Sequence, residues 1–176
     1  MVAATDLPVN ADFEGGFAHD PAGVAESVRL AVETGVAGLS IEDSTGDKAK
    51  PLYDFDNAVA RIRAARQAID RAGGDTLLVG RSEGFVAGTP DLDETIRRLK
   101  AYAAAGADCL YAPGIKTRED RSGGCAEAGQ LGDRQADRAH RRRGRSARGT
   151  AHQPRLRRPP AKNLGVKFFR QPGERF

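Results

Sequence analysis

The 176-residue sequence has no tryptophan, one methionine and two cysteines. Cys109 and Cys125 match neither a disulfide framework nor the paired spacing of a metal site. No apolar run approaches the length of about 18 residues that a membrane span needs. The first residues also lack the charged and apolar regions of a secretory signal. We therefore expect a protein with no membrane segment that is located in the cytoplasm.

Charge is distributed unevenly along the chain, although the formal net charge is only +4. Residues 1–120 carry 13 Lys and Arg against 20 Asp and Glu, whereas residues 121–176 carry 15 against 4. From Gly132 to Arg155 the chain has no Val, Ile, Leu, Met, Phe, Tyr, Trp or Cys. Such a segment cannot bury enough apolar surface to offset the entropy of ordering it. We expect a folded domain in residues 1–120 and a disordered, Arg-rich tail in residues 121–176.

Residues 7–114 alternate between strand-like apolar runs and amphipathic helical patterns. Units of about 30 residues in this order predict right-handed crossovers and a parallel sheet covered by helices. The expected strands lie at residues 7–13, 37–43, 75–85 and 107–114. The expected helices lie at residues 21–35, 58–74 after a cap at Asp56 or Asn57, and 91–106.

Polar residues follow each expected strand, and the carboxyl ends of parallel strands meet at one edge of a sheet. Asp12 and Glu14 are two residues apart, so they are expected to share one face of an extended strand, and Glu42 ends the next strand. Crowded carboxylates repel one another unless a cation neutralises them, and oxygen ligands suit Mg²⁺. The functional interpretation is a Mg²⁺ site. The alternative is that these carboxylates are solvated or cap helices.

Four segments together resemble the isocitrate lyase and phosphoenolpyruvate mutase superfamily: "VNADFEGGF", "GLSIEDS", "LLVGRSEGF" and "GADCLYAPG". The resemblance runs from residue 7 to about residue 120. It implies an α/β fold, with these segments as strands 3 to 6 of a (β/α)8 TIM barrel. It also implies a Mg²⁺ cofactor, a small keto or hydroxy carboxylate substrate, chemistry through an enolate, and homo-oligomers for full-length relatives.

The same resemblance assigns roles to six residues. Two paired acids would bind the metal directly, and a third acid would hold a metal-bound water. One arginine and a glycine turn would bind the substrate. No residue is assigned as the general acid, because the loop "DSTGDKAKPLYD" has no cysteine or histidine. That absence argues against an ordinary isocitrate or methylisocitrate lyase. The implied metal ligands are Asp12, Glu14 and Glu42, and the implied substrate-binding residues are Arg81, Gly15 and Gly16.

Three interpretations of the function are compatible with these residues. The first is a carbon–carbon lyase, such as an oxaloacetate-decarboxylase-like enzyme, and the second is a phosphoenolpyruvate phosphonomutase-like enzyme. The third is a catalytically inactive, truncated fragment, because the resemblance begins at a third strand and we expect the first two strands to be missing.

The Arg-rich tail has two interpretations. A functional basic tail would bind polyanions through phosphate contacts, but it has no interleaved aromatic residues and no nucleic-acid motif, so no specific nucleic-acid partner is expected. The alternative is a shifted reading frame. Codons chosen for residues 125–142 and 145–156 can, in one offset frame, encode segments that resemble the family's seventh and eighth strands. We favour the frameshift.

Overall fold

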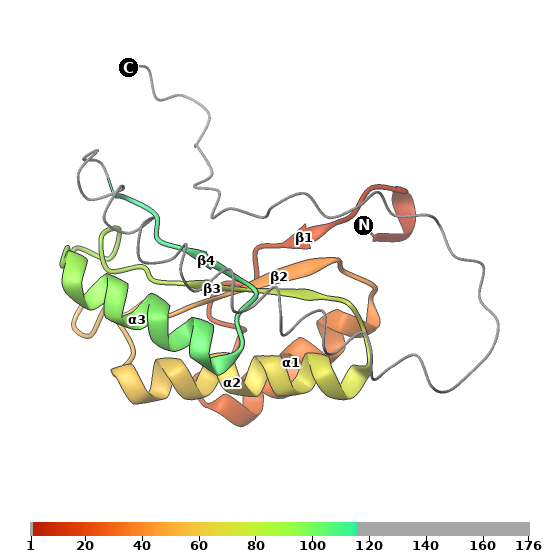
Figure 1. The fold of residues 1–176 in the computed structure, drawn as a ribbon, viewed down its shortest axis with the longest axis horizontal. Coiled ribbons are helices and arrows are strands. Elements are labelled where there is room, and N and C mark those ends of the chain that lie inside the picture. Colours follow the sequence, from red (N-terminus) through yellow and green to blue (C-terminus); the bar gives the residue numbers. More distant parts are fainter. Residues whose placement is uncertain (1, 116–176) are drawn as a thin grey trace, which may run out of the picture.

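The computed structural model describes residues 2–115, and the expected alternation of strands and helices is present there (Figure 1). The expectations for residues 121–176, namely a disordered tail and a shifted frame, lie outside the described residues, as does any boundary near residue 120. A short 3-10 helix covers Val2–Ala4. The strands are β1 (Asn10–Ala11), β2 (Gly38–Glu42), β3 (Leu77–Arg81) and β4 (Cys109–Tyr111), and the helices are α1 (Pro21–Glu33), α2 (Phe55–Ala72) and α3 (Leu92–Ala105).

The four strands form one parallel sheet in the order β1-β2-β3-β4. Figure 1 shows α1, α2 and α3 on the same side of this sheet. A doubly wound sheet places helices on both faces and reverses its strand order, whereas a barrel keeps neighbouring strands in sequence with all helices outside. The described residues therefore have the arrangement of consecutive strands of a barrel wall, as the resemblance implies.

The ends of α1 and α3 follow from local sequence signals. Asp20 caps α1, because its side chain accepts the N–H of Gly23 at 2.9 Å and proline occupies the first turn. Asp91 caps α3 in the same way by accepting the N–H of Glu94 at 3.0 Å. Gly106, with φ of 110°, ends α3 in the left-handed region. These boundaries are confirmed to within about two residues of the expected ones.

The predicted start of α2 was wrong. The helix begins at Phe55, and its cap is Asp54 rather than Asp56 or Asn57. The N–H of Ala58 donates to the Asp54 carbonyl at 2.9 Å, so the helical turns begin earlier than the apolar pattern suggests. Asp56 lies in the first turn, where a carboxylate favours the positive end of the helix dipole.

The first strand is much shorter than predicted. β1 contains only Asn10–Ala11, and Glu14 adopts a left-handed conformation with φ of 46°. Pro8 has no N–H for a strand ladder, and a turn begins at Glu14. The expectation that Asp12 and Glu14 share one face of an extended strand was therefore wrong, because the backbone between them bends out of the strand.

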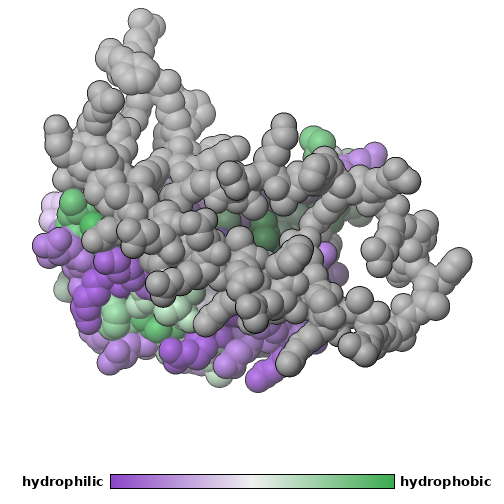
Figure 2. Space-filling view, in the orientation of Figure 1, coloured by the Kyte–Doolittle hydropathy of each residue, from purple (hydrophilic) through white to green (hydrophobic). Residues whose placement is uncertain are grey.

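The core lies between the sheet and the helices. Leu39 and Ile41 of β2 point toward the helices, and Val24, Val28 and Ile62 are buried against them. The helix-bearing side of the described surface is largely hydrophilic in Figure 2, with hydrophobic residues between the hydrophilic ones. No helix in residues 2–115 is long and apolar enough to cross a membrane.

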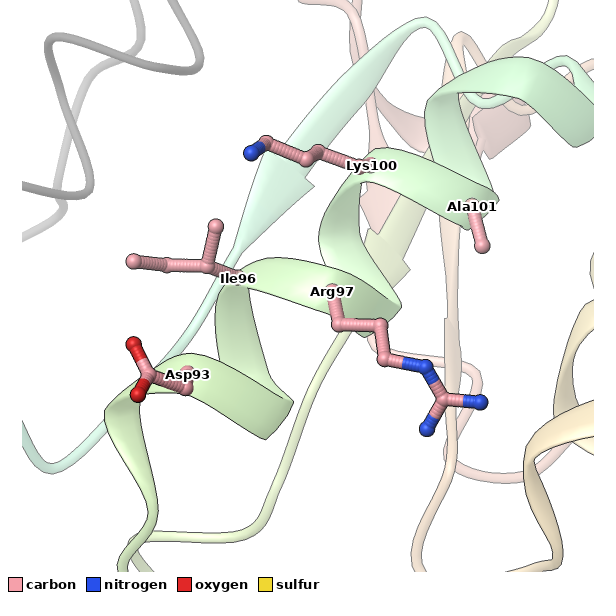
Figure 3. Close-up of a pocket in the computed structure, with 5 residues that line it drawn as sticks. All are labelled: Asp93, Ile96, Arg97, Lys100 and Ala101. Carbon is pink, nitrogen blue, oxygen red and sulfur yellow. The ribbon is translucent and has the colours of Figure 1, made fainter.

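A hollow of about 580 Å³ lies on the outer side of α3 (Figure 3). Its lining comes from that one helix and includes none of the predicted site residues. The lining residues are Asp93, Ile96, Arg97, Lys100 and Ala101.

Candidate functional site

Arg81 is surrounded by carboxylates at the carboxyl ends of the strands. Its Nη1 lies 2.8 Å from Glu42 Oε1 and 2.9 Å from Asp12 Oδ1, and its Nε lies 2.8 Å from Glu83 Oε1. The sheet register creates this cluster, because Glu42 and Arg81 are direct partners on β2 and β3 and therefore point to the same side. Ile41 packs with the helices in the core, so the adjacent Glu42, and with it Arg81, points to the sheet face that the three helices do not cover. Tyr111, the register partner of Arg81 on β4, places its ring 5.3 Å from the guanidinium.

Asp12 is connected to β2 as well as to β3. Ser40 donates its hydroxyl to Asp12 Oδ1 at 3.2 Å, and the N–H of Phe13 donates to the Ser40 hydroxyl oxygen at 3.3 Å. The Asp12 side chain is nevertheless 73% exposed. It is therefore anchored on one side and open to solvent, and thus to a ligand, on the other.

We call residues 12–19 the acidic loop, because they carry Asp12 and Glu14. Left-handed conformations recur in this loop, at Glu14, at Gly16 with φ of 75° and at Phe17 with φ of 53°. A Cβ on Gly16 would lie 3.1 Å from Ile41 and 3.2 Å from Val24, so the turn packs directly on the core. Glycine is required at this position by both its φ and its surroundings.

Burial, together with the excess of acids over the single arginine, determines the protonation of this cluster. Burial raises the pKa of the Glu42 carboxyl to about 7, with further contributions from the negative charges of Glu83, Asp12 and Glu14 and an opposing one from Arg81. Burial also raises the pKa of Glu83, although Arg81 offsets part of that effect. Burial disfavours the charge on Arg81, but Glu83 and Glu42 outweigh it and raise the pKa of the guanidinium. The cluster is short of positive charge.

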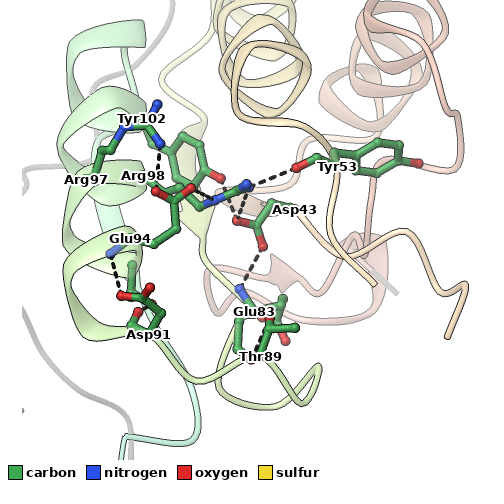
Figure 4. Close-up of polar contacts among 11 residues, drawn as sticks. Asp43, Tyr53, Glu83, Thr89, Asp91, Glu94, Arg97, Arg98 and Tyr102 are labelled. Carbon is green, nitrogen blue, oxygen red and sulfur yellow. Dashed lines mark hydrogen bonds and ion pairs between the residues drawn. The ribbon is translucent and has the colours of Figure 1, made fainter. Parts of the chain in front are cut away.

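A buried polar network lies directly behind the cluster (Figure 4). Asp43, which is 2% exposed, accepts the backbone N–H of Glu83 at 2.7 Å, and its other oxygen accepts the Tyr102 hydroxyl at 2.6 Å and Arg98 Nη1 at 3.2 Å. Arg98 also donates to the Tyr53 carbonyl at 3.1 Å. Burial raises the pKa of the Tyr102 hydroxyl, and the nearby Asp43 carboxylate adds to this. The network ties the ends of β2 and β3 to α3.

Of the predicted site residues, Asp12, Glu42 and Arg81 come together through direct contacts. Glu14 lies in the same loop, and its backbone carbonyl accepts the N–H of Glu42 at 2.9 Å. The N–H of Gly16 donates to the Phe13 carbonyl at 2.8 Å, so it is already engaged within the turn. Within residues 2–115, no three His, Cys, Asp or Glu side chains are arranged around a common point that could hold a metal ion.

Sequence reasoning assigned no role to three residues near this cluster. Glu83 lies two positions after Arg81, so its strand spacing was a usable signal. Asp43 and Arg61 are buried, and their partners come from distant parts of the chain, so neither had a local signal. The loop lysine Lys50 pairs with Asp54 at 2.7 Å on an exposed surface.

An acid-rich cluster at the carboxyl ends of consecutive parallel strands lies where TIM barrels build their sites. The profile of the phosphoenolpyruvate phosphomutase family matches residues 1–130. The chain belongs to this family, within the isocitrate lyase and phosphoenolpyruvate mutase superfamily.

Individual relatives agree with this assignment. Oxaloacetate decarboxylase of Paraburkholderia xenovorans is 34% identical over 121 residues, which are 65% of this chain and 39% of that protein. The crystal structure of 2,3-dimethylmalate lyase superposes with a TM-score of 0.62 at 37% identity, covering 68% of this chain and 41% of that one. Phosphonopyruvate hydrolase in complex with oxalate and Mg²⁺ superposes with a TM-score of 0.63 at 27% identity, covering 71% and 44%. The chain spans about two fifths of the length of the curated relatives it matches.

Proposed function

We propose that the chain carries a Mg²⁺-dependent lyase-type site that acts on a small keto or hydroxy carboxylate through an enolate, with oxaloacetate decarboxylation as the leading reaction. The observation that carries the proposal is the position of Arg81 between acids from neighbouring strand ends. The relatives named oxaloacetate decarboxylase favour a keto dicarboxylate as substrate.

The chemistry of the donor set fits Mg²⁺. Asp12, Glu14 and Glu42 offer only carboxylate oxygens, which are the ligands that this ion prefers. Burial is the main cause of the raised pKa of Glu42, and the neighbouring carboxylates add a second contribution that a divalent cation would relieve. Asp12 and Glu42 share Arg81 Nη1 as a partner. Since Asp12 is largely exposed, it is free to turn from Arg81 toward a cation.

The residues of this chain would act mainly by binding and charge stabilisation. Arg81 lies at the strand ends among these acids and would hold a substrate carboxylate. The Gly15 N–H makes no hydrogen bond within residues 2–115 and is the available backbone donor of the glycine pair. When bound, Mg²⁺ would supply positive charge for the developing enolate oxygen.

In decarboxylation, the bond between the departing carboxylate and the neighbouring carbon breaks. Its electron pair moves through that carbon to the keto oxygen, carbon dioxide leaves, and a proton from solvent completes the product. Arg81 stabilises the negative charge that remains on the substrate.

Phosphonomutase-type chemistry is the second candidate, because the matching family profile is that of phosphoenolpyruvate phosphomutase. Such a reaction would need the same cation and the same arginine. The two candidates therefore differ in the substrate that the open face accepts and not in the residues of the cluster.

The test uses the full chain with oxaloacetate, Mg²⁺ and a pyruvate assay, and 31P NMR with phosphonopyruvate in parallel. Turnover should vanish with a chelator and return with Mg²⁺, and Arg81→Lys should lower it by about 100-fold. Arg97→Met, which alters an exposed arginine of α3, is the matched control. Mn²⁺ binding without turnover would support the inactive-fragment interpretation. Failure to bind Mn²⁺ at millimolar concentration would contradict the proposed site.

A further inference from the structure

The guanidinium of Arg61 in α2 is fully buried, with 0% of the residue exposed, and it makes no ion pair within residues 2–115. Its Nη1 donates to the carbonyl oxygens of Ala18 and His19, each at 2.7 Å, and its Nη2 donates to the carbonyl of Gly15. The three acceptors all belong to the acidic loop. A buried charge is costly unless it is hydrogen-bonded, so this arginine and this loop depend on each other.

An aromatic ring completes the surroundings of Arg61. The guanidinium carbon lies 4.0 Å from the centre of the Tyr53 ring, and the Tyr53 hydroxyl lies 2.8 Å from His19 Nδ1. The planar guanidinium can donate to several carbonyls while it stacks on a ring, whereas a lysine ammonium is a point donor. The site is therefore specific for arginine and not for positive charge alone.

The acidic loop needs an external constraint. Glu14 and Phe17 are not glycines, yet both have positive φ, and such residues persist only where the surrounding structure holds them. On one side the loop is joined to β2 through the bond from the Glu42 N–H to the Glu14 carbonyl. On the other side, the hydrogen bonds from Arg61 hold the carbonyls of Gly15, Ala18 and His19.

We propose that Arg61 is a positioning residue for the candidate metal site. It holds residues 15–19 from behind the sheet and thereby sets the left-handed conformation of Glu14, whose carbonyl accepts the Glu42 N–H. Arg61 itself touches none of the candidate ligands. The consequence for metal binding depends on the proposed function, but the effect on the loop does not.

The first experiment measures amide hydrogen exchange by NMR in the full chain. Arg61→Met and Arg61→Lys are compared with Arg66→Met, a change of the same residue type on the same helix that removes ion pairs to Asp70 and Asp108 instead. The Gly16 and Glu42 amides report on the loop, because their acceptors are the Phe13 and Glu14 carbonyls. We expect exchange at these two amides to rise at least 10-fold in both Arg61 variants and to stay within 2-fold in Arg66→Met.

Exchange is compared at temperatures where circular dichroism shows the variants to be folded to the same extent. Differences in global stability then do not contribute to differences in exchange rate. If Arg61→Met does not fold, Arg61→Lys still tests the proposal, since it keeps the charge and most of the volume. Equal exchange at Gly16 and Glu42 in Arg61→Lys and Arg66→Met would overturn it.

The second experiment measures Mn²⁺ affinity by electron paramagnetic resonance. Arg61→Lys should weaken Mn²⁺ binding at least 5-fold, whereas Arg66→Met should leave it unchanged. Faster loop exchange with unchanged Mn²⁺ affinity would show that Arg61 holds the loop without positioning the ligands, which overturns the proposal. If the unmodified chain does not bind Mn²⁺, the proposed function fails, while the exchange experiment still decides whether Arg61 holds the loop.

Discussion

Glu42 and Arg81 are register partners on adjacent parallel strands, and their side chains meet at 2.8 Å. Arg81 also contacts two further acids, so one cation serves three carboxylates. The excess of three carboxylates over one guanidinium determines how the cluster should respond to mutation, to pH and to added metal.

Removing the positive charge at Arg81 should destabilise the fold as well as the site. Glu83, whose side chain is 7% exposed, would lose its ion-pair partner in Arg81→Met. Loss of one partner of a buried pair costs about 3 kcal/mol of unfolding free energy. Urea unfolding measures this loss of unfolding free energy. Arg97→Met is the control, and it should cost less than about 1 kcal/mol because the Arg97 ion pair is exposed. Equal losses in the two variants would contradict the importance of the cluster.

Stability without metal should fall as pH rises from about 4.5 to 7. Below the pKa of the unfolded chain, Glu42 is protonated in both states and does not affect stability. Between that value and the folded pKa of about 7, only the unfolded state ionises, so the unfolded state is favoured. Above pH 7 the loss is complete, at about 3 kcal/mol.

Urea unfolding at pH 5 and pH 8 measures this dependence, and Glu42→Gln is the control that should flatten it. Saturating Mg²⁺ should restore stability at pH 8, since the ion favours the ionised carboxylates. A chain that becomes more stable from pH 5 to pH 8 in a chelator would contradict the raised pKa of Glu42.

The Asp43 network should behave as a structural unit. Asp43→Ala would remove one of the two carboxylate partners of the buried Arg98, which keeps Glu94, and would release the Glu83 N–H, at a cost of about 3 kcal/mol. Tyr102→Phe removes one hydroxyl and should cost about 1 to 2 kcal/mol. Chemical denaturation of both variants and of the double variant gives the coupling. Additive losses would show that the two side chains act independently.

Gly16→Ala should separate crowding from backbone strain in the acidic loop. The new methyl group would meet Ile41 and Val24 at a positive φ, so we expect a loss of about 2 to 3 kcal/mol. Gly46→Ala is the matched control, because its φ of 77° is similar but no atom lies within 4 Å. That control should cost only the strain of about 1 kcal/mol. Thermal unfolding of both variants provides the comparison.

The sequence by itself determined the alternation of strands and helices and the parallel sheet. Apolar periodicity, the caps at Asp20 and Asp91, and the glycines after α1 and α3 are local signals. Parallel pairing then brings strand ends together, so the proximity of Glu42 and Arg81 also followed from the sequence.

Only the tertiary structure decided how the acidic loop is built. The bend at Glu14 depends on carbonyl bonds from Arg61, 46 residues beyond Gly15, and on the fit of Gly16 against Ile41. Asp43 likewise finds its partners on α3, more than 50 residues away. A buried charge is tolerated only where distant groups satisfy it, and such partners are assembled by packing. Local spacing therefore predicted that Glu42 and Arg81 lie close together, whereas long-range burial set the geometry around them.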